Sequence, residues 1–143
     1  MRAIEITRLG DPVAPNIRFT TDRPEPVPGP GEVRVRTEAS AMNHLDLWGG
    51  RGLPGVEVEW PFTSGSDGVG VVDRVGPGVD EAWIGKRVIL NAAIMHPPKP
   101  KPGERPAGED NGMIGEHRPG THAEFFVAPA VNLIAAGDSD PVE

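Results

Sequence analysis

The chain has 143 residues, a formal net charge of −7 and no cysteine, which suits one folded domain and excludes disulfides, thiolate catalysis and cysteine-held zinc. No apolar run approaches the roughly 18 residues of a membrane span, and no lysine/arginine block offers a basic footprint for nucleic acid. A cytoplasmic protein that binds neither membranes nor nucleic acid is therefore expected.

The N-terminal half of the chain predicts two strands and one helical turn. Residues 4–7 alternate between apolar and polar side chains, as a strand does. Residues 32–39 give the clearest strand signal, because Val33 and Val35 share one face while charged side chains share the other. The helical turn is predicted at 43–48.

Residues 50–55 match the GxGxxG pattern of dinucleotide-binding loops, but their surroundings do not suit one. Such a loop needs a buried strand before it and a helix after it, whose N-terminus meets the pyrophosphate. Here a helical turn that ends at Trp48 comes first, and residues 56–61 show no helical period. The glycines at 65–70 have the reverse spacing and run into a strand. The first stretch is interpreted as a loop that needs positive φ, and no nucleotide-binding fold is expected in this chain.

The C-terminal half predicts three more strands, at 69–75, 87–91 and 122–127, and the first of these ends in a tight turn. Residues 96–111 carry almost no apolar side chains and predict a mobile surface loop. Because 19 Gly and 17 Pro are spread along the whole chain, we predict a mainly β fold, a β-barrel or a partly open sandwich, with one or two short helices.

The last four residues predict the start of a helix. Asp140 suits an N-cap, Pro141 the first helical position and Glu143 the third. We therefore expect the chain to be a fragment of a longer protein.

Four segments, in this order and spacing, carry a family resemblance: PGPGEV at 28–33, NHLDL at 43–47, GSDGVGVV at 65–72 and GEHRPGTHAEFFV at 115–127. Together they resemble the N-terminal catalytic domain of the medium-chain dehydrogenases/reductases, which include zinc alcohol dehydrogenases and zinc-free quinone oxidoreductases. The resemblance implies a GroES-like β-barrel that forms a substrate domain at 1–137. Residues 138–143 would then begin a linker or helix to a Rossmann domain outside this chain.

The resemblance also implies that the protein holds no zinc. Asn43 stands where zinc members have a cysteine ligand and Ser66 where they have a histidine, and neither neutral side chain binds zinc well. The lobe that holds a structural zinc in relatives corresponds to the cysteine-free stretch 96–111. Leu45 replaces the Ser or Thr that relays the alcohol proton, and leucine has no proton to relay. The closest branch is therefore that of the zinc-free quinone oxidoreductases and alkene reductases.

The resemblance implies five site residues, and each has a structural alternative. Asn43 would be a catalytic donor to the substrate carbonyl or the cofactor ribose, and Asp46 would be a catalytic carboxylate that orients Asn43 or His44. Alternatively, Asn43 is an N-cap and Asp46 a helix N-terminal charge. His44 would contact the cofactor pyrophosphate, or is a surface residue. Trp48 and Asp67 would line the substrate pocket, or are a core aromatic and a turn residue. The other histidines are interpreted as surface or strand residues: His96, His117 and His122.

The resulting hypothesis is the substrate domain of a zinc-independent, NAD(P)H-dependent oxidoreductase that reduces a small carbonyl compound, enone or quinone. NADP or NAD would be bound mainly by the Rossmann domain, so we expect this chain to be inactive alone and the parent protein to be a homodimer. Two alternatives stay open. One is an alcohol dehydrogenase-like enzyme with atypical metal ligands, which metal analysis would distinguish. The other is a free-standing, non-catalytic GroES-like binding module, which gene length would distinguish.

Overall fold

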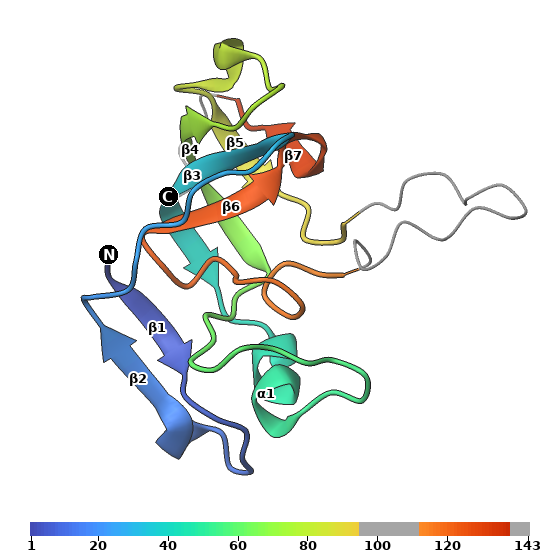
Figure 1. Ribbon diagram of the computed structural model, residues 1–143. Helices are drawn as coiled ribbons and strands as arrows, with labels where there is room; N and C mark the ends of the chain where they lie inside the picture. The colour runs from blue at the N-terminus through green and yellow to red at the C-terminus, as the bar shows by residue number, and fades with distance from the viewer. Residues whose placement is uncertain (95–111, 138–143) are drawn as a thin grey trace, which may run out of the picture.

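The computed structural model describes residues 1–94 and 112–137 and shows a mainly β protein (Figure 1). Within these ranges lie seven strands, one α-helix and three 3₁₀ helices, the last at Ala14–Asn16, Glu81–Trp83 and Ala130–Asn132. The prediction of a mainly β fold with short helices is confirmed. The loop predicted at 96–111 and the helix start predicted at 138–143 lie outside the described residues.

The strands form two antiparallel sheets. In the smaller one, β1 (Ala3–Ile6) pairs with β2 (Ile17–Thr20). The larger sheet has the order β6-β3-β4-β5-β7 and consists of β3 (Glu32–Ala41), β4 (Asp67–Val75), β5 (Arg87–Leu90), β6 (Phe125–Pro129) and β7 (Leu133–Ala135). Among the described residues no strand pairing joins β6 to β7, so the arrangement is partly open.

Strand β6 begins three residues later than the strand predicted at 122–127. The residues before it bend, because the His122 N–H donates to the Ser64 carbonyl (3.1 Å) and the His122 carbonyl accepts from the Ile4 N–H (2.8 Å). The same bend brings His122 across the chain at Gly65, where it becomes part of the site described below.

Strand β3 lies between β6 and β4 in the larger sheet and carries the centre of the core. Val33 and Val35 are fully buried. Arg34, predicted on the charged face, is buried as well, because Asp73 accepts hydrogen bonds of 3.0 and 2.6 Å from its guanidinium. The same guanidinium lies 4.5 Å from the ring centre of Phe125. The core of the domain therefore includes one satisfied arginine beside its aliphatic side chains.

Helix α1 (His44–Arg51) begins where the sequence predicts a helical turn and extends further than predicted. Gly50 permits this extension, since a Cβ at this position would lie 2.4 Å from a Val13 methyl carbon. Gly52 (φ 105°) ends the helix and Gly55 (φ 78°) turns the chain. The interpretation as a loop with positive φ is confirmed for these two glycines and wrong for Gly50, which is helical.

Three segments converge beside α1 and position the site (Figure 1). Strand β3 leads into α1, and β4 begins opposite the end of β3, where Asp67 pairs with Ala41. The third segment contains Thr121 and crosses the chain at Gly65, whose carbonyl accepts a hydrogen bond from the Thr121 N–H at 2.9 Å. Gly65 has φ of 105°, and a Cβ there would lie 2.6 Å from Thr121 Oγ1. The close crossing therefore requires glycine.

Candidate functional site

Asn43 caps helix α1 from an extended backbone conformation (φ −121°, ψ 154°). Its Oδ1 accepts a hydrogen bond from the Leu45 N–H at 3.1 Å, and its own backbone N–H donates to Asp46 Oδ2 at 2.8 Å. This is the capping box that the spacing of Asn43 and Asp46 predicts, and the prediction is confirmed. The cap uses the oxygen of the carboxamide and leaves its nitrogen for other partners.

The nitrogen of the same carboxamide faces β4. Asn43 Nδ2 donates to Asp67 Oδ2 at 2.9 Å, and both residues are exposed. An amide nitrogen carries two hydrogens. The second has no partner among the residues that the structure describes, so it is available to an oxygen atom of a bound molecule.

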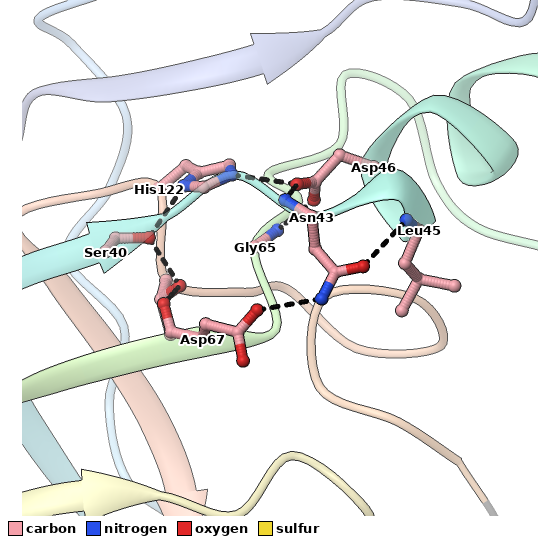
Figure 2. A network of polar contacts seen from close by, with 8 residues as sticks. Ser40, Asn43, Leu45, Asp46, Gly65, Asp67 and His122 are labelled. Carbon is pink, nitrogen blue, oxygen red and sulfur yellow. Dashed lines mark hydrogen bonds and ion pairs between the residues drawn. The ribbon is translucent and has the colours of Figure 1, made fainter.

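Asp46 is buried and joins three segments (Figure 2). Besides the Asn43 N–H, its carboxylate accepts from the Gly65 N–H at 2.9 Å and lies 3.3 Å from His122 Nε2. Burial acts to raise the pKa of Asp46, but the hydrogen bonds from His122 and from the amides of Asn43 and Gly65 outweigh it and hold that pKa below its usual value. Asp46 is therefore an ionised acceptor that ties α1 to the chain at Gly65.

His122 also belongs to this site, although the sequence analysis does not place it there. Its side chain is 10% exposed, so the interpretation as a surface or strand residue is wrong. The ring lies between Asp46 on one side and Ser40 Oγ, 2.7 Å from Nδ1, on the other (Figure 2). Ser40 Oγ is also 2.8 Å from Thr121 Oγ1, which donates to the Asp67 carbonyl at 2.9 Å. Only the fold brings Ser40 and His122 together, since they are 82 residues apart.

His44 and Trp48 form an aromatic pair on the exposed side of α1. Their ring centres are 5.0 Å apart with the planes tilted by 46°. His44 is exposed, and Trp48 is 50% exposed, which excludes the alternative that it is a core aromatic. His44 directly follows the Asn43 cap and Trp48 lies one turn further along the helix, so four of the five predicted site residues, including Asp46, belong to α1 and its cap.

The two residues that stand where zinc members of the family have ligands, Asn43 and Ser66, do not fit a zinc ion. The carboxamide oxygen of Asn43 is engaged by the Leu45 N–H, and Ser66 is buried. Within residues 1–94 and 112–137, no three His, Asp or Glu side chains lie close enough to hold a metal ion.

No described helix is long and apolar enough to cross a bilayer.

An apolar groove of about 600 Å³ lies beside His122. The small sheet supplies part of its exposed apolar lining, including Ile17 and Phe19, which are 41% and 65% exposed. Ser40 and His122 form part of the polar side of this groove.

Comparison with known proteins links this geometry to one family. The model of the alcohol dehydrogenase GroES-like domain matches residues 29–138. The chain is 44% identical to the synaptic vesicle membrane protein VAT-1 homolog of Rattus norvegicus over 71 residues, which are 49% of this chain and 18% of that protein. It is 43% identical to a 2-haloacrylate reductase of Burkholderia sp over 63 residues, which are 43% of this chain and 19% of the reductase.

Solved structures agree over almost the whole chain. A structure of an NAD-dependent alcohol dehydrogenase is matched with a TM-score of 0.74 and 40% identity over 94% of this chain and 39% of that one. A mycobacterial protein complexed with NADPH is matched with a TM-score of 0.65 and 32% identity, over 96% of this chain and 33% of that one. The chain thus spans about a fifth of the two curated relatives and less than half of the two solved chains.

Proposed function

Because the chain belongs to the alcohol dehydrogenase GroES-like domain family, within the medium-chain dehydrogenases/reductases, we propose that it is the substrate domain of an NAD(P)H-dependent reductase that works without zinc. Its acceptor would be a quinone, an activated alkene or a related carbonyl compound. The similarity to a 2-haloacrylate reductase supports an activated alkene, and the likeness to a structure complexed with NADPH supports a nicotinamide cofactor. We further propose a cytoplasmic parent protein that is a homodimer and binds the cofactor mainly through a second domain.

The arrangement of Asn43 carries this proposal. Its backbone N–H, its Oδ1 and one hydrogen of its Nδ2 are all engaged, at 2.8, 3.1 and 2.9 Å. The carboxamide is therefore fixed before any ligand arrives, and one N–H at an exposed position stays available. A preorganised donor of this kind stabilises charge that develops on an acceptor oxygen.

The proposed reaction needs only such a donor from this domain. A reduced nicotinamide, held mainly by the second domain, would supply a hydride with its two electrons to the carbon β to the carbonyl of the acceptor. Negative charge then develops on the carbonyl oxygen, which would accept a hydrogen bond from Asn43 Nδ2. A proton from water completes the reduction. Because the conjugated acceptor spreads the charge itself, neither a Lewis acid nor the hydroxyl that Leu45 replaces is required.

The other predicted residues would act around this donor. The exposed His44 ring, at the first position of α1, would contact the pyrophosphate of the cofactor. Trp48, whose ring contacts His44, would line the acceptor pocket together with Asp67, which also orients Asn43. Asp46 would act through Asn43 and the capped helix.

The intact protein tests the proposal directly. We expect it to oxidise NADPH or NADH with a quinone or an α,β-unsaturated carbonyl compound, to be poor with simple alcohols, and to contain less than about 0.2 zinc per chain. Its activity should survive a chelator. One tightly bound zinc per chain together with chelator-sensitive alcohol oxidation would instead establish an alcohol dehydrogenase with atypical metal ligands.

A further inference from the structure

The contacts around Asn43 close into a ring of hydrogen bonds, which we call the Asn43 ring. From the Asn43 backbone N–H it runs to Asp46 Oδ2 (2.8 Å), which lies 3.3 Å from His122 Nε2. It continues from His122 Nδ1 to Ser40 Oγ (2.7 Å) and Thr121 Oγ1 (2.8 Å). It returns through the Asp67 carbonyl (2.9 Å), and the Asp67 carboxylate accepts from Asn43 Nδ2 (2.9 Å). Figure 2 shows how its labelled members surround Asn43.

A count of hydrogens fixes the direction of each bond in the Asn43 ring. The Asp67 carbonyl can only accept, so Thr121 uses its one hydroxyl hydrogen there and must accept from Ser40. Ser40 then has no hydrogen for the imidazole, so His122 Nδ1 must donate. His122 Nε2 must donate as well, since its partner is the ionised carboxylate of Asp46. All the bonds form together only when His122 carries hydrogen on both ring nitrogens.

We propose that His122 is a positioning residue for Asn43, and that the Asn43 ring opens when His122 loses one of its two ring hydrogens. The inference rests on the proposed function, because it affects turnover only if Asn43 contacts the acceptor. A neutral His122 that keeps its bond to Asp46 has no hydrogen on Nδ1. The single hydroxyl hydrogen of Ser40 can then be donated either to His122 Nδ1 or to Thr121 Oγ1, but not to both. The connection between the cap of α1 and the start of β4 is then broken on one side.

The charged groups near His122 are few, and most already have partners. Asp46 of α1 faces the ring directly, and Asp67 at the start of β4 lies across the Asn43 ring. Arg2 and Glu124, which line the same groove, pair with each other at 2.7 Å. Glu38 of β3 also lines this groove and accepts from Arg87 at 2.8 Å. His122 is therefore the member of the ring whose residue type ordinarily changes charge between pH 5 and 8.

Nuclear magnetic resonance of the labelled 143-residue chain tests the inference without cofactor or substrate. Between pH 5 and 8.5, the backbone amide and the Nδ2 signals of Asn43 should shift with the same midpoint as the ring nitrogens of His122. His122→Gln keeps a donor toward Asp46 but cannot titrate, so both shifts should vanish. His44→Gln, which removes the neighbouring histidine, should leave them. Signals that follow His44, or that stay still while His122 titrates, would overturn the inference.

Ser40→Ala distinguishes coupling through the Asn43 ring from a direct effect of the charge of His122. Because Ser40 is exposed, this variant does not open a cavity in the core. Without Ser40 the backbone amide of Asn43 should still respond through Asp46, whereas the Nδ2 signal should stop following His122. An Nδ2 shift that persists in Ser40→Ala would mean that only the charge of His122 is sensed, and the ring would be refuted.

Turnover of the intact protein distinguishes the two proposals. If both hold, the turnover number falls as rising pH removes a ring hydrogen from His122, and His122→Gln loses this dependence. If the resonance signals are coupled but turnover ignores the state of His122, the Asn43 ring stands and the catalytic role of Asn43 fails. If the signals are not coupled, the ring fails whatever the activity.

Discussion

Asn43 combines a structural and a proposed chemical task in one carboxamide. Its oxygen caps α1 and its nitrogen keeps one hydrogen for an acceptor. Asn43→Ala should therefore lower the free energy of unfolding by about 1 kcal/mol. It should also lower the turnover number of the intact protein by about 10²–10³-fold. Urea unfolding and the oxidation of NAD(P)H at saturating acceptor measure the two effects.

Asn43→Ser is the matched control for this variant. Serine caps a helix about as well as asparagine but has no carboxamide, so stability should be kept while turnover remains low. If Asn43→Ala instead stays within about threefold of the wild-type turnover number and loses only stability, Asn43 is a cap and its catalytic assignment is wrong.

Asp46 makes the stability of the domain depend on pH at the acid end. Burial acts to raise its pKa, but the hydrogen bonds from His122, Asn43 and Gly65 lower it overall. A carboxyl group with a lowered folded pKa stabilises above its unfolded pKa, and the contribution is lost as pH falls through the folded pKa. Asp46→Asn should therefore cost about 1–3 kcal/mol at neutral pH, and its difference from wild type should shrink below about pH 4.

Urea unfolding between pH 2.5 and 7 measures this dependence. Glu124→Gln serves as the control, because it removes an exposed carboxyl whose pKa is lowered by hydrogen bonds from Arg2, and it should change stability far less. A deficit of Asp46→Asn that is the same at every pH would show that the lost carboxylate charge plays no part.

Single-residue roles are predictable from the sequence where the partners are local. The cap of Asn43 by Asp46 follows from a spacing of three residues and is confirmed. His122 is not predictable in this way, because Asp46 and Ser40 reach it from 76 and 82 residues away. Its neighbours become known only when the bend before β6 is known.

Among the connecting elements, the crossing at Gly65 is sensitive to substitution. Gly65→Ala should cost about 3 kcal/mol or more, because positive φ and a contact with Thr121 at 2.6 Å act together. Gly78→Ala is the control: Gly78 also has positive φ (80°), but a Cβ there meets nothing within 4 Å, so we expect only about 1–2 kcal/mol. Equal costs in urea unfolding would show that the contact with Thr121 contributes nothing.

Elements with a buried face were predictable, and those without one were not. Strands β1, β3, β4 and β5 lie within two residues of the predicted bounds. The alternation expected for β1 is wrong, because Ile4 is exposed and Glu5 is buried. Strand β2 was missed because three of its four residues are exposed and its pattern shows no core face. Helix α1 ends at Arg51, beyond the predicted end at residue 48. Close packing of Gly50 against Val13 overrides the low helix propensity of glycine.

For the molecule as a whole, the proposed binding of the nucleotide by a second domain leads to a test of the 143-residue chain. The GxGxxG stretch has no preceding strand of its own, and no helix follows it within residues 52–66, so it cannot hold a pyrophosphate as a dinucleotide fold does. Isothermal titration of NADH and NADPH into the chain should give dissociation constants weaker than about 1 mM. Micromolar binding would mean that this domain holds the cofactor without a Rossmann partner.

The span of the Asn43 ring along the chain also bears on how the domain folds. Its cap forms between neighbours, whereas its link from Ser40 to His122 closes a loop of 82 residues, and contacts so distant in sequence slow folding and tend to form after local ones. The capping box can therefore form locally in a partly folded chain before Asn43 is held toward β4, although the short helix itself still depends on tertiary packing. The donor geometry is complete only at the end of folding, so a kinetically trapped domain would lack a formed site.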